Sequence, residues 1–291
     1  MTQRQTGMPA GLSEDRLDRI KRVFEDVRWT LGVCWVGELF ELLAVYDLYL
    51  QAAWLQLKPS VASAYFDRTS REVQARALRA VIDAGFPVSD HRRLVGALQE
   101  GAEPLPVSAG EEAALGVTLD LLERLNAETL LVATAVRDAL LGREVGALPP
   151  RTGPDAALRP EPAPIVVRLR WAEGAVADVT GPPDGGFASR EYLLLAAWGD
   201  YFETVRRELR PLLRSPAYAQ GAAQLDIYAT AAVRALPYPF RANGELARSL
   251  GYAGADVSDI LAGVTEAQKR LCELALQTAT LRLGWSGGNM G

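Results

Sequence analysis

The segment ELLAVYDLYLQAAWLQLKP, residues 41–59, decides the fold, because it returns later in the chain as LLLAAWGDYFETVRRELRP, residues 193–211. In both segments large apolar residues recur at the three- and four-residue spacing of one helix face. Tyr49 meets Tyr201 at an offset of 152 residues (49 to 201). Further pairs share this offset: Trp35 with Phe187, Phe40 with Tyr192, Tyr46 with Trp198, Pro59 with Pro211, and Ser63 with Ser215. Amphipathic helices share apolar positions by chance, but they do not readily align a proline and a serine too, so we infer a duplication.

The duplication extends to the last helical pattern of each half, at a slightly different offset. Glu128, Leu131 and Arg137 there match Glu273, Leu276 and Arg282. A period this long indicates duplicated domains and not a solenoid of short repeats. The sequence therefore predicts an all-α protein in which two homologous helical repeats form an internal pseudo-dimer.

A change of composition divides the two repeats. The stretch LPPRTGPDAALRPEPAP, residues 148–164, is rich in proline and has no periodic apolar face. We predict a first repeat over 1–145, a linker over 146–164 and a second repeat over 165–291. The run IVVRLRW, residues 165–171, alternates enough to suggest a short strand.

Local signals place the first helices. Ser13 is the predicted N-cap of the first helix, and Pro59 and Pro211 are each expected where a helix stops. Further helical patterns cover residues 68–84, 110–126 and 127–142, and helices resume after the turn at Gly185-Gly186.

Composition limits the classes of partner. Of the 291 residues 49% are hydrophobic, so the chain can bury a large core. The net charge is −5 and basic residues are scattered among acidic ones, so we expect neither nucleic acid nor a membrane surface as partner. The first dozen residues lack a signal-peptide core, and no uncharged apolar run of about 18 residues follows. We expect a cytoplasmic protein.

Few residues suit metal, cofactor or nucleophilic chemistry. The single histidine, His91, lies in a polar run, and Cys34 and Cys272 are too distant in sequence for a CxxC pair. We interpret both cysteines as buried thiols and expect no catalytic triad and no metal site. Neither GxGxxG nor GxxxxGK[ST] occurs, so we expect no nucleotide cofactor.

Carboxylates and hydroxyls must therefore carry any catalysis. Glu191 follows a glycine bend and begins an apolar helix, where partial desolvation would suit it to activating water. The alternative is an ordinary partner of the helix dipole. Ser63 and Asp67, four residues apart, either share a helical face toward a pocket or are a cap and a surface charge. Four aromatic residues either wall an apolar cavity or belong to the core: Trp35, Tyr192, Trp198 and Tyr201.

Four stretches resemble the group I 2-haloacid dehalogenase family, whose members act on D- and L-2-haloacids. They are FEDVRWTLGVCWVGELFELLAVYDLYLQAAW at 24–54, LNAETLLVATAVRDALLGREVG at 125–146, ASREYLLLAAW at 188–198 and VRALPYPFRANGEL at 233–246. The resemblance spans nearly the whole chain at low identity. It implies two helical repeats joined by a linker, with the active site between them, and direct displacement of halide at C2 by an activated water with inversion.

The resemblance also assigns roles residue by residue. The family's water-activating aspartate falls on Glu191, and a threonine and a glutamate of its first repeat fall on Ser63 and Asp67. It implies substrate binding at Trp35, Glu38, Ser189, Tyr192, Trp198 and Gln268. This chain departs from the family where Glu38 replaces a phenylalanine, Gln268 a tyrosine and Ala197 an asparagine, so we expect a more polar pocket. Catalytic geometry is sensitive to shifts of about 1 Å, so the exchanges at Glu191, Ser63 and Asp67 bear on the rate and on the substrate.

We expect a cofactor-independent hydrolase whose partner is a small carboxylic acid, held by Arg28 or Arg190. The protein can also form a homodimer, as the resembling family does. The alternative is a non-catalytic or redirected homologue that binds a small organic acid between the repeats. A third hypothesis, peroxide chemistry with paired cysteines as in wider fold relatives, is disfavoured because no CxxC occurs.

Overall fold

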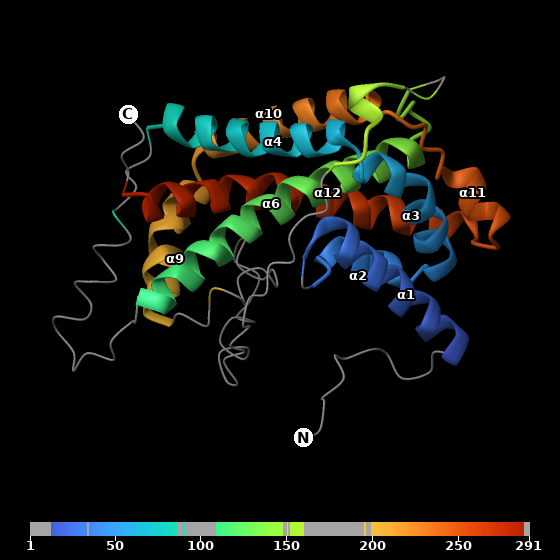
Figure 1. Ribbon diagram of the computed structural model, residues 1–291, viewed down its shortest axis with the longest axis horizontal. Helices are drawn as coiled ribbons and strands as arrows, with labels where there is room; N and C mark the ends of the chain where they lie inside the picture. Colours follow the sequence, from blue (N-terminus) through green and yellow to red (C-terminus); the bar gives the residue numbers. More distant parts are fainter. Residues whose placement is uncertain are drawn as a thin grey trace.

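The structure, a computed structural model, describes residues 13–33, 35–85, 90, 109–147, 150, 152–159, 195 and 199–287. Within these residues every named element is a helix (Figure 1), and one isolated bridge pairs Ser63 with Leu158. The predicted strand at 165–171 and the turn at Gly185-Gly186 lie outside the described residues.

The helices fall on both sides of the proline-rich segment. Those of the first half are α1 (Glu14–Leu31), α2 (Glu38–Ala44), α3 (Asp47–Val61), α4 (Ala64–Asp83) and α6 (Ala109–Leu140). The short 3-10 helix η1 (Pro154–Ala156) follows. Those of the second half are α9 (Gly199–Leu213), α10 (Pro216–Arg234), α11 (Gly244–Ser249) and α12 (Gly254–Trp285).

Helix boundaries repeat at the offsets that the sequence pattern predicts. α9 ends 152 residues after α3 (61 to 213). α4 and α10 begin 152 residues apart (64 to 216), and each follows a serine whose hydroxyl accepts a hydrogen bond from the amide three residues on. α12 ends 145 residues after α6 (140 to 285). The boundaries of these three helix pairs therefore agree with a duplication.

Two long antiparallel helices form the centre of the core. The beginning of α6 lies beside the end of α12, since Asp120 pairs with Arg282 at 2.7 Å. Residues 125–139 of α6 are buried without interruption, as expected of a helix that is covered on every side. Figure 1 shows α4 and α10 side by side on one face of this central pair, with α3 and α9 toward its opposite ends. The middle of α6 is thus enclosed by the rest of the fold.

Two expectations about helix ends were wrong. Pro59 and Pro211 lie inside α3 and α9, which continue to Val61 and Leu213. A proline removes a single ladder bond, and in α3 the flanking Leu57 and Val61 are buried, so packing maintains the last turn. The separate patterns at 110–126 and 127–142 form one helix, because no glycine or proline interrupts the chain between them. Ser13 is the N-cap of α1 as predicted, although its hydroxyl makes no capping bond.

The described part of the linker docks on the first half. The Arg159 amide donates to the Ala62 carbonyl at 2.8 Å, and the Ala64 amide donates to the Ala157 carbonyl at 2.7 Å. Residues 152–159 thereby lie against the junction of α3 and α4. This docking positions the Arg159 side chain toward the middle of α6.

Candidate active site

Ser63 and Asp67 begin α4, one turn apart. The Ser63 hydroxyl accepts from the Phe66 amide at 3.2 Å and donates to the Ser60 carbonyl at 2.5 Å, so it caps the helix. The Asp67 carboxylate pairs with Arg71 at 2.9 Å and is 30% exposed. The structure therefore gives both residues local partners of the kind that the alternative interpretation predicts.

A buried ion pair lies next to this turn. The Arg159 Nη1 donates to Glu128 Oε1 at 2.6 Å, and the two side chains are only 5% and 1% exposed. The Arg159 Nη2 donates to the Thr30 carbonyl at the end of α1. The linker thus delivers a guanidinium group that compensates a carboxylate in the middle of a buried helix.

A second arginine reaches the same end of α1. The Arg124 Nη2 donates to the carbonyl oxygens of Leu31 and Gly32 at 2.9 and 2.7 Å. Gly32 has a positive φ of 64° and ends α1 in the left-handed conformation that glycine favours. Arg124 and Glu128 are one turn apart on α6, so their side chains share a face. Two guanidinium groups therefore flank one carboxylate.

Unpaired polar atoms gather along this part of α6 and at the end of α1. Buried polar atoms nearly always have a partner, so each exception is informative. Among the described residues, the buried atoms without a hydrogen-bond partner include Thr30 Oγ1, Arg124 Nε, Asn126 Nδ2 and Oδ1, Glu128 Oε2 and Thr129 Oγ1. We refer to Thr30, Arg124, Asn126, Glu128, Thr129 and Arg159 as the buried polar cluster.

Burial changes the acid–base behaviour of the cluster. Desolvation raises the pKa of Glu128, while the positive charges of Arg159 and Arg124 oppose that rise and the Asp67 charge adds to it. Burial also raises the pKa of the Cys272 thiol to about 12, so this cysteine stays protonated at neutral pH, as befits the buried thiol that was predicted.

The predicted substrate-binding residues that the structure describes have separate surroundings. Trp35 is half-buried and packs on the core. Glu38 accepts two bonds from Arg270 Nη1, at 2.6 and 2.8 Å, so its charge is compensated by α12. Gln268 is buried and donates to Asp226 Oδ1 at 2.8 Å. No contact among the described residues joins Trp35, Glu38 and Gln268. Gln268 belongs instead to a polar network on α10 and α12.

The remaining predicted residues lie outside the described residues. These are Glu191, Ser189, Tyr192 and Trp198, together with Arg190, His91 and Cys34. Arg28, the other arginine considered for the substrate carboxylate, is exposed in the last turn of α1.

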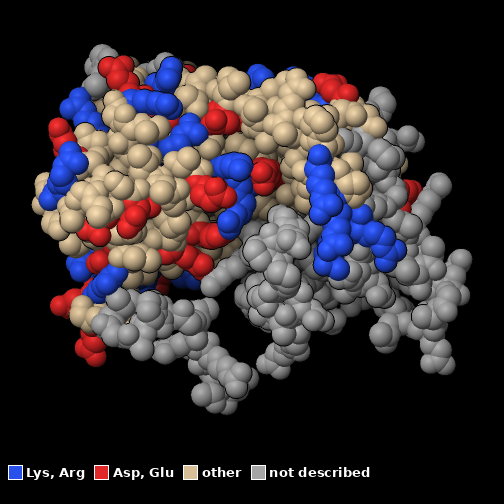
Figure 2. Space-filling model, turned by 180° about the vertical axis from the view of Figure 1, so that it is seen from behind, with Lys and Arg blue, Asp and Glu red and all other residues tan. Residues whose placement is uncertain are grey.

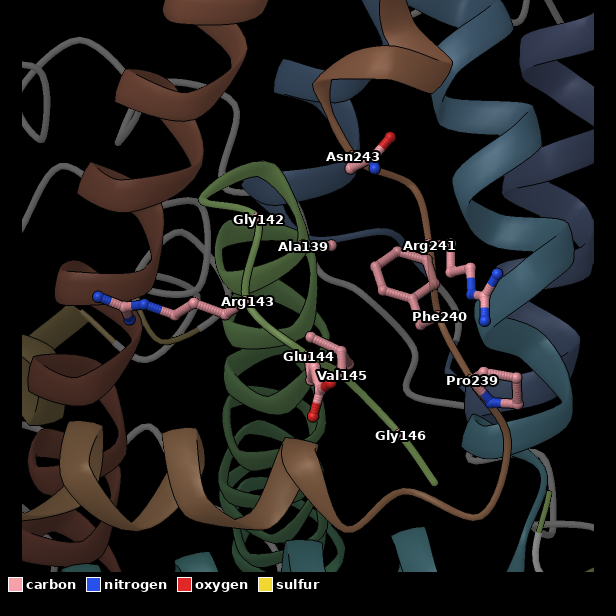
Figure 3. Close-up of a pocket in the computed structure, with 10 residues that line it drawn as sticks. All are labelled: Ala139, Gly142, Arg143, Glu144, Val145, Gly146, Pro239, Phe240, Arg241 and Asn243. Atoms are coloured by element: carbon pink, nitrogen blue, oxygen red, sulfur yellow. The ribbon is translucent and has the colours of Figure 1, made fainter. Parts of the chain in front are cut away.

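A cavity of about 390 Å³ lies where the end of the first repeat meets the second. Figure 3 shows residues 142–146 facing residues 239–243 across it, with the Arg143 and Arg241 side chains pointing away from each other. Gly146 is required here, because a Cβ would lie 1.9 Å from the Tyr238 carbonyl oxygen. None of the predicted site residues that the structure describes lines this cavity.

Charges of both signs cover the described surface. Figure 2 shows acidic and basic side chains interspersed over most of the described part of one face. In the described part of the chain no helix has the length and the apolar run needed to cross a bilayer. Among the same residues, cysteine and acidic side chains form no group of three or more that would hold a metal ion.

Comparison with known proteins gives a consistent result over nearly the full length. An (R)-2-haloacid dehalogenase from Pseudomonas putida is 26% identical over 279 residues, which cover 90% of this chain and 88% of that one. An (R)-2-haloacid dehalogenase from Rhizobium sp. (strain NHG3) is 27% identical over 236 residues, covering 78% and 87%. These similarities support the resemblance to the 2-haloacid dehalogenase family.

Solved structures share the fold of this chain. A D-2-haloacid dehalogenase mutant in complex with D-2-CPA has a TM-score of 0.79 at 23% identity, covering 94% of this chain and 93% of that one. A second D-2-haloacid dehalogenase mutant gives 0.78 at 24% identity, with 91% of each chain covered. No family model matches the chain.

Within this 2-haloacid dehalogenase fold, sequence reasoning missed most of the buried polar cluster. Glu128 was recognised as a marker of the repeat and not as a site residue, although a charged residue inside LNAETLLVATA was a usable signal. Nothing in the sequence marked Arg159 as a site residue, because an arginine in a proline-rich linker is typical of a solvated segment. Nothing marked Arg124 either, because its helix was expected to end close to it.

Proposed function

We propose that the chain is a cofactor-independent 2-haloacid dehalogenase that hydrolyses a small 2-halocarboxylic acid to the 2-hydroxy acid. The observation that carries this proposal is the likeness to an (R)-2-haloacid dehalogenase over 90% of the chain. Since two relatives bear the (R) designation, we expect the R enantiomer to be the better substrate.

The proposed reaction is one displacement. A water oxygen attacks C2 while the carbon–halogen bond breaks, and the halide leaves with the bonding pair. The carboxylate of Glu191 accepts the proton that the water loses and later passes it to solvent. No covalent intermediate is involved, and attack opposite the leaving group inverts C2.

The buried polar cluster supports this proposal from the side of the first repeat. It lies beside Ser63 and Asp67, which the resemblance assigns to water or substrate orientation. Low polarity around a fixed set of donors strengthens each electrostatic interaction with a bound acid. The proposal therefore combines an acid of the second repeat with polar groups of the first.

Chloride release from R- and S-2-chloropropionate tests the proposal. Glu191→Gln should lower kcat by 100-fold or more, because a general base contributes about 10²–10⁴ in rate. Glu245→Gln, an exposed carboxylate in the first turn of α11, is the matched control and should leave kcat unchanged. Equal turnover by Glu191→Gln and wild type would remove Glu191 from this role.

One observation favours a second candidate, a homologue that binds a small organic acid without releasing halide. Ser63 caps α4 and Asp67 pairs with Arg71, so both side chains already have structural partners. This candidate predicts that lactate or propionate raises Tm while no chloride is released. Glu191→Asp, which restores the family residue, would then create or raise chloride release. The first candidate predicts release by the wild type.

A further inference from the structure

We infer that Arg124 binds the carboxylate of the substrate acid, an inference that rests on the proposed function and names the cation of that site. Arg28 is exposed at the last turn of α1, whereas Arg124 reaches into the buried polar cluster. The guanidinium of Arg124 has a fixed orientation and retains an unused donor, as a carboxylate receptor requires.

Hydrogen bonding leaves part of the Arg124 guanidinium unoccupied. Its Nη2 contacts the carbonyl oxygens of Leu31 and Gly32, which anchor the group in one orientation. Its Nε is buried and has no partner. A guanidinium has five N–H donors, and this Nε–H is available to an oxygen of a bound carboxylate.

The charges of the buried polar cluster favour the binding of an anion. Glu128 is the only carboxylate of the buried polar cluster, and it is bound by Arg159 at 2.6 Å. Asp67 lies near but is paired with Arg71 at 2.9 Å. With two guanidinium groups and one carboxylate, the cluster carries one positive charge in excess among the described residues. A monoanionic acid would neutralise it in surroundings where an unpaired charge is costly.

The position of Arg124 connects this charge with the expected pocket. Its two carbonyl partners end α1, and the chain reaches Trp35 only three residues after Gly32. A carboxylate on Arg124 would therefore be bound close to the predicted pocket tryptophan. The equivalent position of α12, 145 residues later, is Lys269, which is exposed to solvent. At this position α6 therefore has a partly buried cation, whereas α12 has an exposed one.

The test compares Arg124→Lys and Arg124→Met with Lys269→Met in the full-length protein. Two quantities are measured: KM for chloride release from R-2-chloropropionate, and the Kd of lactate, the corresponding product, by calorimetry. Arg124→Lys retains a donor for the α1 carbonyls and so keeps the fold, but it loses the unpartnered Nε–H donor. We expect both constants to rise about tenfold or more in Arg124→Lys and further in Arg124→Met, with kcat less affected. Lys269→Met should leave both unchanged.

The outcomes separate this inference from the proposed function. If the wild type binds lactate through Arg124 but releases no chloride, the proposed reaction fails and carboxylate binding stands. If the wild type releases chloride and both constants in Arg124→Lys stay within twofold of it, the inference is overturned. Lactamide, which lacks the negative charge, should bind wild type and Arg124→Lys equally weakly. A strong preference of the wild type for lactamide would also overturn it.

Discussion

The middle of α6 and the middle of α12 occupy equivalent places in the two halves, yet they differ in polarity. Asn126 and Thr129 of α6 correspond, at the offset of 145, to Leu271 and Leu274 of α12, and all four are buried. The architecture therefore accepts leucine at these places. A buried amide or hydroxyl without a partner lowers the stability of the fold. We therefore infer that Asn126 and Thr129 serve a purpose other than stability.

The acidic pair Glu128 and Glu273 shows the same divergence. Both sit at equivalent places of the two central helices, but Glu128 has a buried arginine from the linker. Glu273 is half-buried, and its burial raises its pKa against the opposing charges of Lys269 and Arg270. At the start of α4 and α10 the serine caps are shared, whereas Asp67 becomes Ala219. The two halves share these helix signals, whereas among the described residues the polar cluster belongs to α6, the end of α1 and the linker.

The largest effect should come from removing the cation that distinguishes Glu128 from Glu273. Arg159→Met removes the hydrogen-bonded partner of a buried carboxylate, so we expect the free energy of unfolding to fall by about 3–5 kcal/mol. Urea unfolding measures it. Arg68→Met breaks the exposed pair between α4 and Asp155 of the same linker and should cost less than about 1 kcal/mol. Similar losses in both variants would mean that the linker, and not the buried charge, determines the effect.

An exchange between the halves should produce opposite changes in stability. Asn126→Leu installs the residue of α12 and removes an unpaired buried amide, so we expect a gain of about 1 kcal/mol. We also expect kcat/KM for chloride release to fall tenfold or more, because the polar cluster is altered. Leu271→Asn should lose about 2 kcal/mol through the buried polar group and leave kcat/KM unchanged. Unaltered turnover by Asn126→Leu would separate Asn126 from the site.

The smallest effect concerns Glu273 and its pH dependence. A carboxyl whose pKa is raised in the folded state binds its proton more tightly there, so the folded state is favoured at low pH and loses stability as the pH rises through that pKa. Glu273→Gln removes this loss. We expect the Tm of the variant to equal that of the wild type near pH 4 and to exceed it slightly by pH 8. A difference that shrinks with rising pH would contradict the assignment.

Sequence reasoning succeeded where signals are local. The helical period of residues 41–59, its return at 193–211 and the serine caps predicted the helices of both halves, because capping and amphipathicity depend on a few neighbouring residues. It failed at Pro59, where packing of Leu57 and Val61 maintains a turn that proline weakens. The structure pairs Gln268 with Asp226, and its role in substrate binding stays a prediction.

The sequence alone determined the helical class and indicated the repeat and the family resemblance. Each of these can be recognised from the order and spacing of residues along the chain. Only the tertiary structure could join Glu128 with Arg159, 31 residues later, and bring Arg124 to the carbonyls at the end of α1. The physical reason is that burial strengthens the interaction between charges. An arginine in a proline-rich linker contributes little while water surrounds it, but it stabilises the buried Glu128 once packing excludes the water.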